Sequence, residues 1–433
     1  MELMIAVPLI LPEEALDLAA LEGRVQAWGQ ELMRQGLAAA WAAQAPLRPA
    51  PACPVCAADT VRPAGHKPRK VETGFGPVWL PRQRVRCAGC GRHFQPDDAV
   101  LGPTLGGGRL SPRLTDLAAL CGASWPYRQA AEVLGRLRGA PLAHETVRAV
   151  VGRVGTRVAA AHAAAAAAVC APGSRTTGAA AARPIPAQIA IELDGAWVAS
   201  HDTAHGLEVK VGVVHAGSEA IGRTRRRLCQ RRFAATARGV AAFAPLMTAA
   251  IDHHNGFAAP QQTLLGDGAS WIWHFGDEAL PEATGVLDRW HLRDARRRAV
   301  RAALPEKTER APWSGRLEAL LEVGDVPGAV AALAELAAHT PHPALEDFAR
   351  YLTTLAPHIP DYAARRAAGE RIGSGAIEKG VDLVANRRLK GKRGMRWWRD
   401  RVEGVTALRV TLLNHEWDHD VGPALTAQQL PAF

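Results

Sequence analysis

The chain has 433 residues, 48% of them hydrophobic and 22% charged, which predicts a globular protein with roughly two to four domains. Its formal net charge of +10 suits a polyanionic partner such as nucleic acid, although it also favours plain solubility. The sequence opens with no basic-then-apolar signal and has no apolar run of about 18 residues outside an alanine-rich tract. These features argue against a membrane partner and lead us to expect a cytoplasmic protein.

An N-terminal helical segment is expected over residues 1–45. Apolar residues recur at helical spacing between residues 12 and 43. Glu13 and Glu14 fall in what would be the first turn, where the helix dipole favours anions. Packing or self-association is the expected role of this helix.

Residues 46–105 are expected to form a zinc-ribbon domain, because they contain two CxxC pairs. Between the pairs, residues 71–85 alternate like a β-hairpin. Four thiolates on two tight turns match the tetrahedral ligand set of structural Zn²⁺. Two unmetallated pairs, or a redox pair, are the alternatives. The predicted zinc ligands are Cys53, Cys56, Cys87 and Cys90.

Residues 106–170 are expected to form a helix-turn-helix DNA-binding domain. Three helical segments cover residues 112–120, 127–137 and 144–158, and a turn containing Gly139 separates the last two. Arg148 lies near the start of the third segment, where a recognition helix would meet DNA. Any small three-helix domain would give the same pattern, so the pattern alone supports a purely structural three-helix domain equally well.

A linker rich in Ala, Gly, Thr and Pro is expected over residues 171–186, followed by an α/β core. The first part of this core spans residues 187–304. Three strands (189–200, 207–215 and 226–234) precede a helix near 240–253. A fourth strand then ends at Asp267, and a fifth, 285–287, follows after another helix. This is the element order of the ribonuclease H fold, in which the acid on the first strand lies beside the acid after the fourth.

The α/β pattern is interrupted by an expected all-helical insertion over residues 305–370, where leucines recur in helical stripes. The last part of the core, with a basic tail, is expected over residues 371–433. The predicted fold class is therefore multidomain: a ribonuclease H-like α/β catalytic core with a mixed five-stranded sheet and an all-helical insertion, preceded by the zinc ribbon and the helix-turn-helix domain.

Three carboxylates from separate elements of this core are candidate metal ligands. Asp194 follows an alternating apolar strand, Asp267 follows another apolar run, and Glu378 lies at the start of a predicted helix. Carboxylates prefer hard cations, so Mg²⁺ or Mn²⁺ is the expected ion. Two such ions about 4 Å apart can activate a water or a 3′-hydroxyl in phosphoryl transfer.

Each of these acids also has a structural interpretation. Asp194 and Asp267 could be turn residues, with Asp288 the true second acid, and Glu378 could serve a capping role near Ser374. Glu192 shares a strand face with Asp194 and is expected to make an ordinary ion pair, with a supporting role at the metal site as the alternative.

A basic run with interleaved tryptophans follows Glu378 closely. Such a run is usually a solvated face, but its position beside a candidate metal site leads us to expect phosphate contact and base stacking. The predicted DNA-binding residues here are Arg387, Arg388, Lys390, Lys392, Arg393, Arg396, Trp397 and Trp398.

In combination, four sequence blocks resemble those of DDE transposases of bacterial insertion sequences, of the ISKra class related to Mutator-like elements. The blocks are IELDGAW, LLGDGASWIW, VLDRWH and GSGAIEKG, and CPVC…CAGC, the following RLSPRL and the helix-turn-helix stretch are similar to that family too. The resemblance covers residues from about 50 to 415. It implies a ribonuclease H-like core with Asp194, Asp267 and Glu378 as catalytic metal ligands, and a supportive D-x-x-H element at Asp288 and His291.

The sequence therefore predicts a DNA transposase that cleaves strands at element ends and joins them to target DNA. Double-stranded DNA is the expected partner, and a homodimer or higher oligomer on DNA is the expected assembly, associated with a bacterial nucleoid. A ribonuclease H-like nuclease or resolvase that only hydrolyses is the first alternative. A non-catalytic zinc-ribbon and helix-turn-helix DNA-binding protein is the second.

Overall fold

The structure is a computed structural model that describes residues 3–14, 16–48, 52–106, 108–171, 173, 183–222, 226–391 and 394–426. The chain divides into two compact units: a first unit of residues 1–158 with 416–433, and a second unit of residues 159–415. Within the described ranges, no helix has the length and apolar character needed to cross a membrane.

The first unit contains two small sheets and several helices. One sheet has the strand order β1-β4-β5, and the other is the β2–β3 hairpin. Its elements are α1 (Leu18–Ala43), η1 (Ala45–Leu47), β1 (Val61–His66), β2 (Arg69–Thr73), β3 (Gly76–Leu80), β4 (Gln83–Cys87), β5 (His93–Phe94), α2 (Asp98–Leu105), α3 (Pro112–Ser124), α4 (Tyr127–Arg138), the first part of α5 (His144–Cys170) and α16 (Trp417–Thr426).

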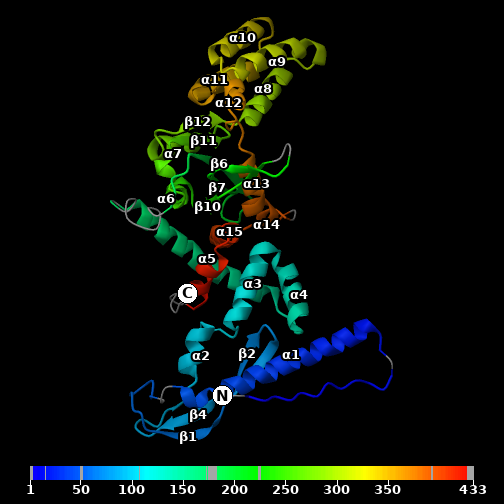
Figure 1. Ribbon diagram of the computed structural model, residues 1–433, viewed down its shortest axis with the longest axis vertical. Coiled ribbons are helices and arrows are strands. Elements are labelled where there is room, and N and C mark those ends of the chain that lie inside the picture. The colour runs from blue at the N-terminus through cyan, green and yellow to red at the C-terminus, as the bar shows by residue number, and fades with distance from the viewer. Residues whose placement is uncertain are drawn as a thin grey trace. The chain divides into compact units, whose positions relative to one another are not determined.

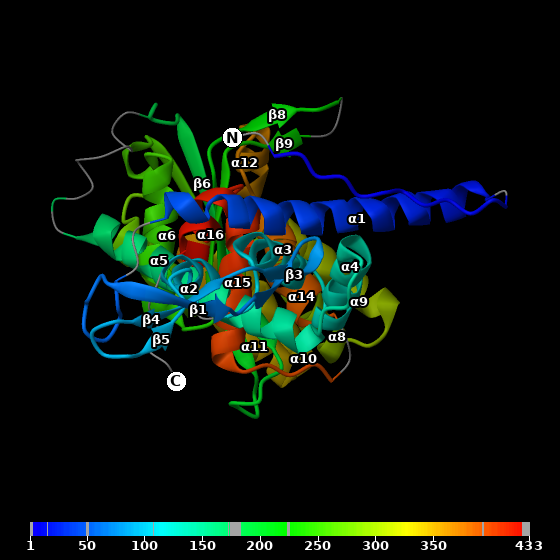
Figure 2. The same cartoon turned by 90° about the horizontal axis from the view of Figure 1, so that it is seen from below.

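Helix α1 begins later than the apolar pattern suggests. Asp17 accepts a hydrogen bond from the Ala20 N–H and so caps the helix, which places the first helical residue at Leu18. The preceding extended segment runs back along α1, where the Trp28 indole donates to the Val7 carbonyl at 2.7 Å. Figure 1 and Figure 2 both show α1 as one straight helix, and it packs on β3.

The three predicted helices of residues 106–170 are present as α3, α4 and α5. Ser111 caps α3, and α4 ends where Gly139 adopts a left-handed conformation. Arg138 is buried at this turn, and its guanidinium donates to the carbonyls of Thr73 and Ala140 and pairs with Glu72. The turn is therefore tied to the β2–β3 hairpin. Because the alanine-rich tract continues the helix, α5 extends to Cys170.

The second unit is built on a mixed five-stranded sheet with the order β10-β7-β6-β11-β12. Strand β7 runs antiparallel to both β6 and β10, while β6, β11 and β12 are parallel. The strands are β6 (Gln188–Val198), β7 (Leu207–His215), β10 (Arg231–Thr236), β11 (Gln261–Gly266) and β12 (Thr284–Leu287).

The third predicted strand, over residues 226–234, is wrong in one respect. The chain forms two strands there, because Gln230 has a positive φ of 49° that breaks the extended backbone. The first, β9 (Arg226–Leu228), pairs with β8 (Ser218–Ala220) in a separate hairpin, and the second is β10. Of the predicted linker, residues 172 and 174–182 lie outside the described residues.

Helices cover the sheet and extend beyond its β12 edge. Leu265 and Val286 of the sheet belong to the same buried cluster as Leu333 and Leu352 of the predicted helical insertion, so the insertion shares its core with the sheet. Figure 1 shows α9 to α12 gathered beyond β12. The helices are α6 (Val240–His253), η3 (Gly256–Ala258), α7 (Ser270–Ala279), α8 (Arg289–Ala303), α9 (Lys307–Glu322), α10 (Val326–His339), α11 (Pro343–Leu355), η4 (Ala356–His358), α12 (Tyr362–Ala367), α13 (Gly375–Val381), the π-helical η5 (Asp382–Asn386), α14 (Arg387–Leu389) and α15 (Arg399–Leu413).

Candidate functional site

Three acidic residues lie in one row across the parallel strands of the second unit. Leu265 of β11 is paired with Glu192 of β6, and continuing this register by two residues brings Asp267 beside Asp194. The register between β11 and β12 likewise brings Asp288 beside Asp267, and the Asp288 N–H donates to the Gly266 carbonyl at 2.8 Å. These acids therefore lie side by side where β11 and β12 end, with Asp194 inside the longer strand β6.

Helix α13 brings the fourth acid to this row. It packs against β6 and β7, and Glu378 is exposed in its first turn. Burial is the largest cause of a rise in the pKa of Asp194 to about 6, and the negative charges of Asp267 and Glu378 add to this rise. The Gly195 N–H, which donates to Asp194 at 2.6 Å, and the nearby His291 act in the opposite direction. Asp267 and Glu378 thus lie close enough to Asp194 for their charges to affect its protonation.

The three carboxylates are not drawn together around a single point in this structure. Across the described ranges, the only group of three or more Cys, His, Asp or Glu residues with ligand atoms all within 4.8 Å of one another is a set of four cysteines. The donor chemistry of the acids suits a hard divalent cation, because ionised carboxylates offer only oxygen. Binding one ion by all three would require them to move closer together.

Asp288 has a different environment from the other acids, because hydrogen bonds occupy both of its oxygens. One oxygen accepts from the His291 backbone N–H at 2.8 Å and from its ring Nδ1 at 3.0 Å. The other accepts from the Ser374 N–H at 2.6 Å and hydroxyl at 2.9 Å. Burial alone would raise the pKa of Asp288, but these hydrogen bonds hold it at about 2. Asp288 therefore caps α8 and holds the segment before α13, which favours Asp267 as the second metal ligand.

His291 contacts Asp288 and lies close enough to Asp267 and Asp194 for their charges to act on it. Its hydrogen bond to Asp288 is the main cause of a raised pKa, and the charges of Asp267 and Asp194 raise it further. Because an ionised carboxylate can only accept, the ring nitrogen facing Asp288 carries the proton. The family resemblance implied a supportive role for this pair, but no local signal identified Ser374 as its partner, 86 positions from Asp288.

The predicted DNA-binding residues near α13 divide into an exposed and a buried group. Arg387, Lys390, Arg396 and Trp398 are exposed, and so is Arg148 in the first unit, which pairs with Glu145. The Trp398 ring stacks on His201 with centroids 5.1 Å apart. Lys392 and Arg393 lie outside the described residues.

Arg388 and Trp397 differ from the prediction, because both are buried. Trp397 is 7% exposed, its indole donates to the Leu389 carbonyl at 3.0 Å, and its backbone pairs with residues that follow β6. The Arg388 guanidinium lies over the Trp397 ring, 5.0 Å from its centroid, and the residue is 2% exposed. These two side chains are core residues in this structure, and of the two tryptophans Trp398 is the exposed one.

The four cysteines of the first unit form two matching turns. Ala57 N–H donates to the Cys53 carbonyl and Gly91 N–H to the Cys87 carbonyl, and both donors have a positive φ. Across the turns, the Cys53 and Cys90 sulfurs lie 3.6 Å apart, as do those of Cys56 and Cys87. Ligands at 2.3 Å from a tetrahedral ion would be separated by about 3.8 Å. The quartet could therefore hold a structural metal such as zinc.

No protein-family model matches the sequence, and no curated protein matches it. The chemistry that bears on function lies in two sites: a row of carboxylates across the parallel strands of the second unit and a cysteine quartet in the first unit.

Proposed function

We propose that the protein is a DDE-type DNA transposase that acts on double-stranded DNA with a ribonuclease H-like core. The observation that carries the proposal is that Asp194 and Asp267 lie side by side on neighbouring parallel strands, with Glu378 close enough for its charge to act on Asp194. The strand order supports it too, because the first strand of the sheet, β6, lies beside the fourth, β11.

In this proposal, the three carboxylates hold Mg²⁺ or Mn²⁺. Such ions would activate a water or a 3′-hydroxyl for attack on a phosphodiester and stabilise the leaving oxygen. Asp194 and Asp267 are supplied by the rigid sheet, and Glu378 by the helix above it. Asp288 positions the segment that leads to Glu378, and its partner His291 places a proton-bearing ring near the acids.

Exposed cations that follow Glu378 would bind the DNA backbone. Arg387 comes directly after the π-helical turn that continues α13, Lys390 follows α14, and Arg396 precedes the exposed Trp398. Phosphate contacts by such side chains position DNA without reading its sequence. In the first unit, the proposed Zn²⁺ would be held by the cysteine quartet, and α3 to α5 would supply sequence-specific contacts.

A strand-transfer assay tests the proposal. Purified protein, Mn²⁺, a labelled fragment carrying the DNA that flanks its own gene, and a supercoiled plasmid are incubated together, and covalent joining is scored on a denaturing gel. We expect joined products from the wild type and from Asp347→Asn, a control that removes an exposed carboxylate on α11. Asp194→Asn, Asp267→Asn and Glu378→Gln should each abolish both cleavage and joining.

Other results of this assay would support one of the alternative functions or a different second metal ligand. Cleavage without joining would indicate a nuclease or resolvase, and binding without cleavage would indicate a non-catalytic DNA-binding protein. An active Asp267→Asn variant with an inactive Asp288→Asn variant would show that Asp288 is the second ligand.

A further inference from the structure

Glu192 is a fully buried carboxylate on β6, two residues before Asp194. Its side chain is 0% exposed, and one oxygen accepts from two consecutive backbone N–H groups of α13, those of Ala376 at 2.9 Å and Ile377 at 3.0 Å. The residue at the N-cap position itself, Ser374, makes no side-chain cap hydrogen bond to this helix. Glu192 thus satisfies the start of α13 from a strand 184 positions away in the sequence.

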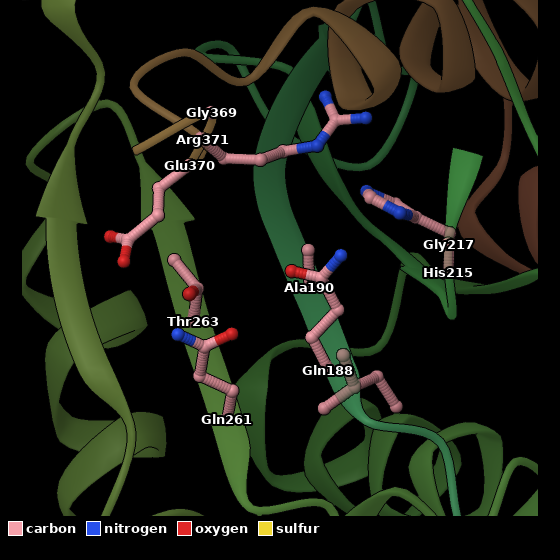
Figure 3. Close-up of a pocket in the computed structure, with 10 residues that line it drawn as sticks. Gln188, Ala190, His215, Gly217, Gln261, Thr263, Gly369, Glu370 and Arg371 are labelled. Atoms are coloured by element: carbon pink, nitrogen blue, oxygen red, sulfur yellow. The ribbon is translucent and has the colours of Figure 1, made fainter. Parts of the chain in front are cut away.

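The other oxygen of Glu192 faces a histidine and an arginine, and the arginine supplies a positive charge. His215 Nε2 lies 3.1 Å from it, and the Arg371 guanidinium lies 3.5 Å from it. Figure 3 shows the Arg371 side chain crossing β6 and the His215 ring pointing toward that strand. A buried carboxylate without partners would be strongly destabilising, and an apolar residue would suit this strand position better for packing alone. The hydrogen bonds to α13 are what an apolar residue could not supply.

These contacts fix the helix beside the row of acids. Glu192 and Asp194 project to the same face of β6, because side chains two apart on a strand share a face. The two N–H groups that Glu192 holds belong to the residues immediately before Glu378. The separation between the backbones of Asp194 and Glu378 is therefore set by a strand of fixed geometry at one end and by the bonds to Glu192 at the other.

We propose that Glu192 is a positioning residue that sets the separation between Asp194 and Glu378 by holding the first turn of α13 on the sheet. The inference rests on the proposed function, because it gives Glu192 its role through the metal-binding acids. Groups that orient metal ligands typically change metal affinity or activity about 10- to 100-fold when they are removed.

Hydrogen exchange tests the contact itself. Glu192→Gln keeps a carbonyl acceptor of similar size, whereas Glu192→Leu keeps the volume but has no acceptor. We expect the amide of residue 376 to exchange about tenfold faster or more in Glu192→Leu, with an intermediate effect in Glu192→Gln. The amide of residue 377 should change less, because it also donates to the Ser374 carbonyl at 3.1 Å. The matched control is Glu335→Gln, which removes an exposed carboxylate of α10 paired with Arg316. Faster exchange throughout the sheet would indicate a general loss of stability and would overturn the proposal.

Calorimetric titration with Mn²⁺ tests the consequence, independently of DNA cleavage. We expect Glu192→Gln to weaken Mn²⁺ binding about 10-fold or more, and to add no further loss in a Glu378→Gln background, because it acts through that side chain. Unchanged Mn²⁺ affinity in Glu192→Gln and Glu192→Leu would overturn the positioning role alone. Mn²⁺ binding that depends on Glu192, in a protein that never cleaves DNA, would support the positioning role and overturn the transposase. A wild type that does not bind Mn²⁺ would overturn both.

Discussion

Neutralising Asp194 should make the metal-free protein more stable while it destroys the proposed activity. Asp194 is partly buried beside other carboxylates, and its pKa in the folded chain is about 6 against an ordinary value of 3.8. A carboxyl group whose folded pKa is raised favours the native state in its protonated form. The stabilisation that protonated Asp194 gives the folded state is therefore present at low pH and is lost as the pH rises from about 4 through 6.

The size of this effect follows from the two pKa values. Their difference, at 1.36 kcal/mol for each pH unit, corresponds to about 3 kcal/mol of destabilisation above pH 6. Because solvent reaches part of the side chain, we expect Asp194→Asn to raise the free energy of unfolding by about 1–3 kcal/mol at pH 7.5. Asparagine keeps an oxygen that can accept the Gly195 N–H, so this hydrogen bond is not lost. For a unit of this size, each kcal/mol corresponds to about 2–4 °C in Tm.

Thermal unfolding of the metal-free variants measures the effect. Asp194→Asn should unfold at a higher temperature than the wild type at pH 7.5, and the difference should vanish near pH 4. Asp347→Asn should show neither change. Mn²⁺ should raise the Tm of the wild type but not of Asp194→Asn, and cleavage by the wild type should increase as the pH rises through 6. A lower Tm for Asp194→Asn at pH 7.5 would refute the claim that like charge and burial act on Asp194.

Three further predictions concern other parts of the chain. Elemental analysis should find a single zinc ion per chain, and the double variant Cys53→Ser/Cys87→Ser should lose it; metal retained by that variant would exclude the cysteine site. Trp397→Ala should destabilise the protein by about 3–5 kcal/mol in denaturant unfolding. Trp398→Ala should leave stability nearly unchanged and weaken DNA binding by about 1–3 kcal/mol in a filter-binding assay. The reverse pattern would contradict the burial of Trp397 and the exposure of Trp398. Asp288→Asn should lower the free energy of unfolding by about 1–3 kcal/mol at pH 7. The difference from the wild type should shrink as the pH falls from about 4 toward 2, where the wild-type carboxylate becomes protonated. A difference that does not change with pH would argue that the hydrogen bonds to the ionised carboxylate are not its cause.

The sequence predicted the parts of the fold that depend on local periodicity. Alternating apolar residues indicated the strand that became β6, and leucine stripes indicated helices in residues 305–370. The strand over residues 226–234 was placed less well, because a left-handed residue such as Gln230 leaves no signal in apolar spacing. The start of α1 was also missed by several residues, because its cap, Asp17, lies within a longer apolar pattern.

A residue of the candidate site could be predicted only where the residues next to it in the sequence indicated its place in the fold. The row of Asp194 and Asp267 follows from strand order, and register brings them together as expected. The roles of Glu192 and Asp288 as holders of α13 depend on partners far away in sequence, which no local pattern reveals. Arg388 was misjudged for a related reason: in a run of cations every side chain is read as solvent-exposed, although packing against Trp397 buries this one.

The link between Asp288 and Ser374 has a consequence for the order in which the site is assembled. It joins residues 86 positions apart, and the helices α9 to α12 occupy most of that interval. At synthesis rates of about 5–20 residues per second, Glu378 leaves the ribosome about 5–20 s after Asp288. During this interval the nascent chain carries two of the proposed ligands without the third. We therefore expect a newly made chain to remain inert toward DNA until the helices have folded and brought the last acid back to the sheet.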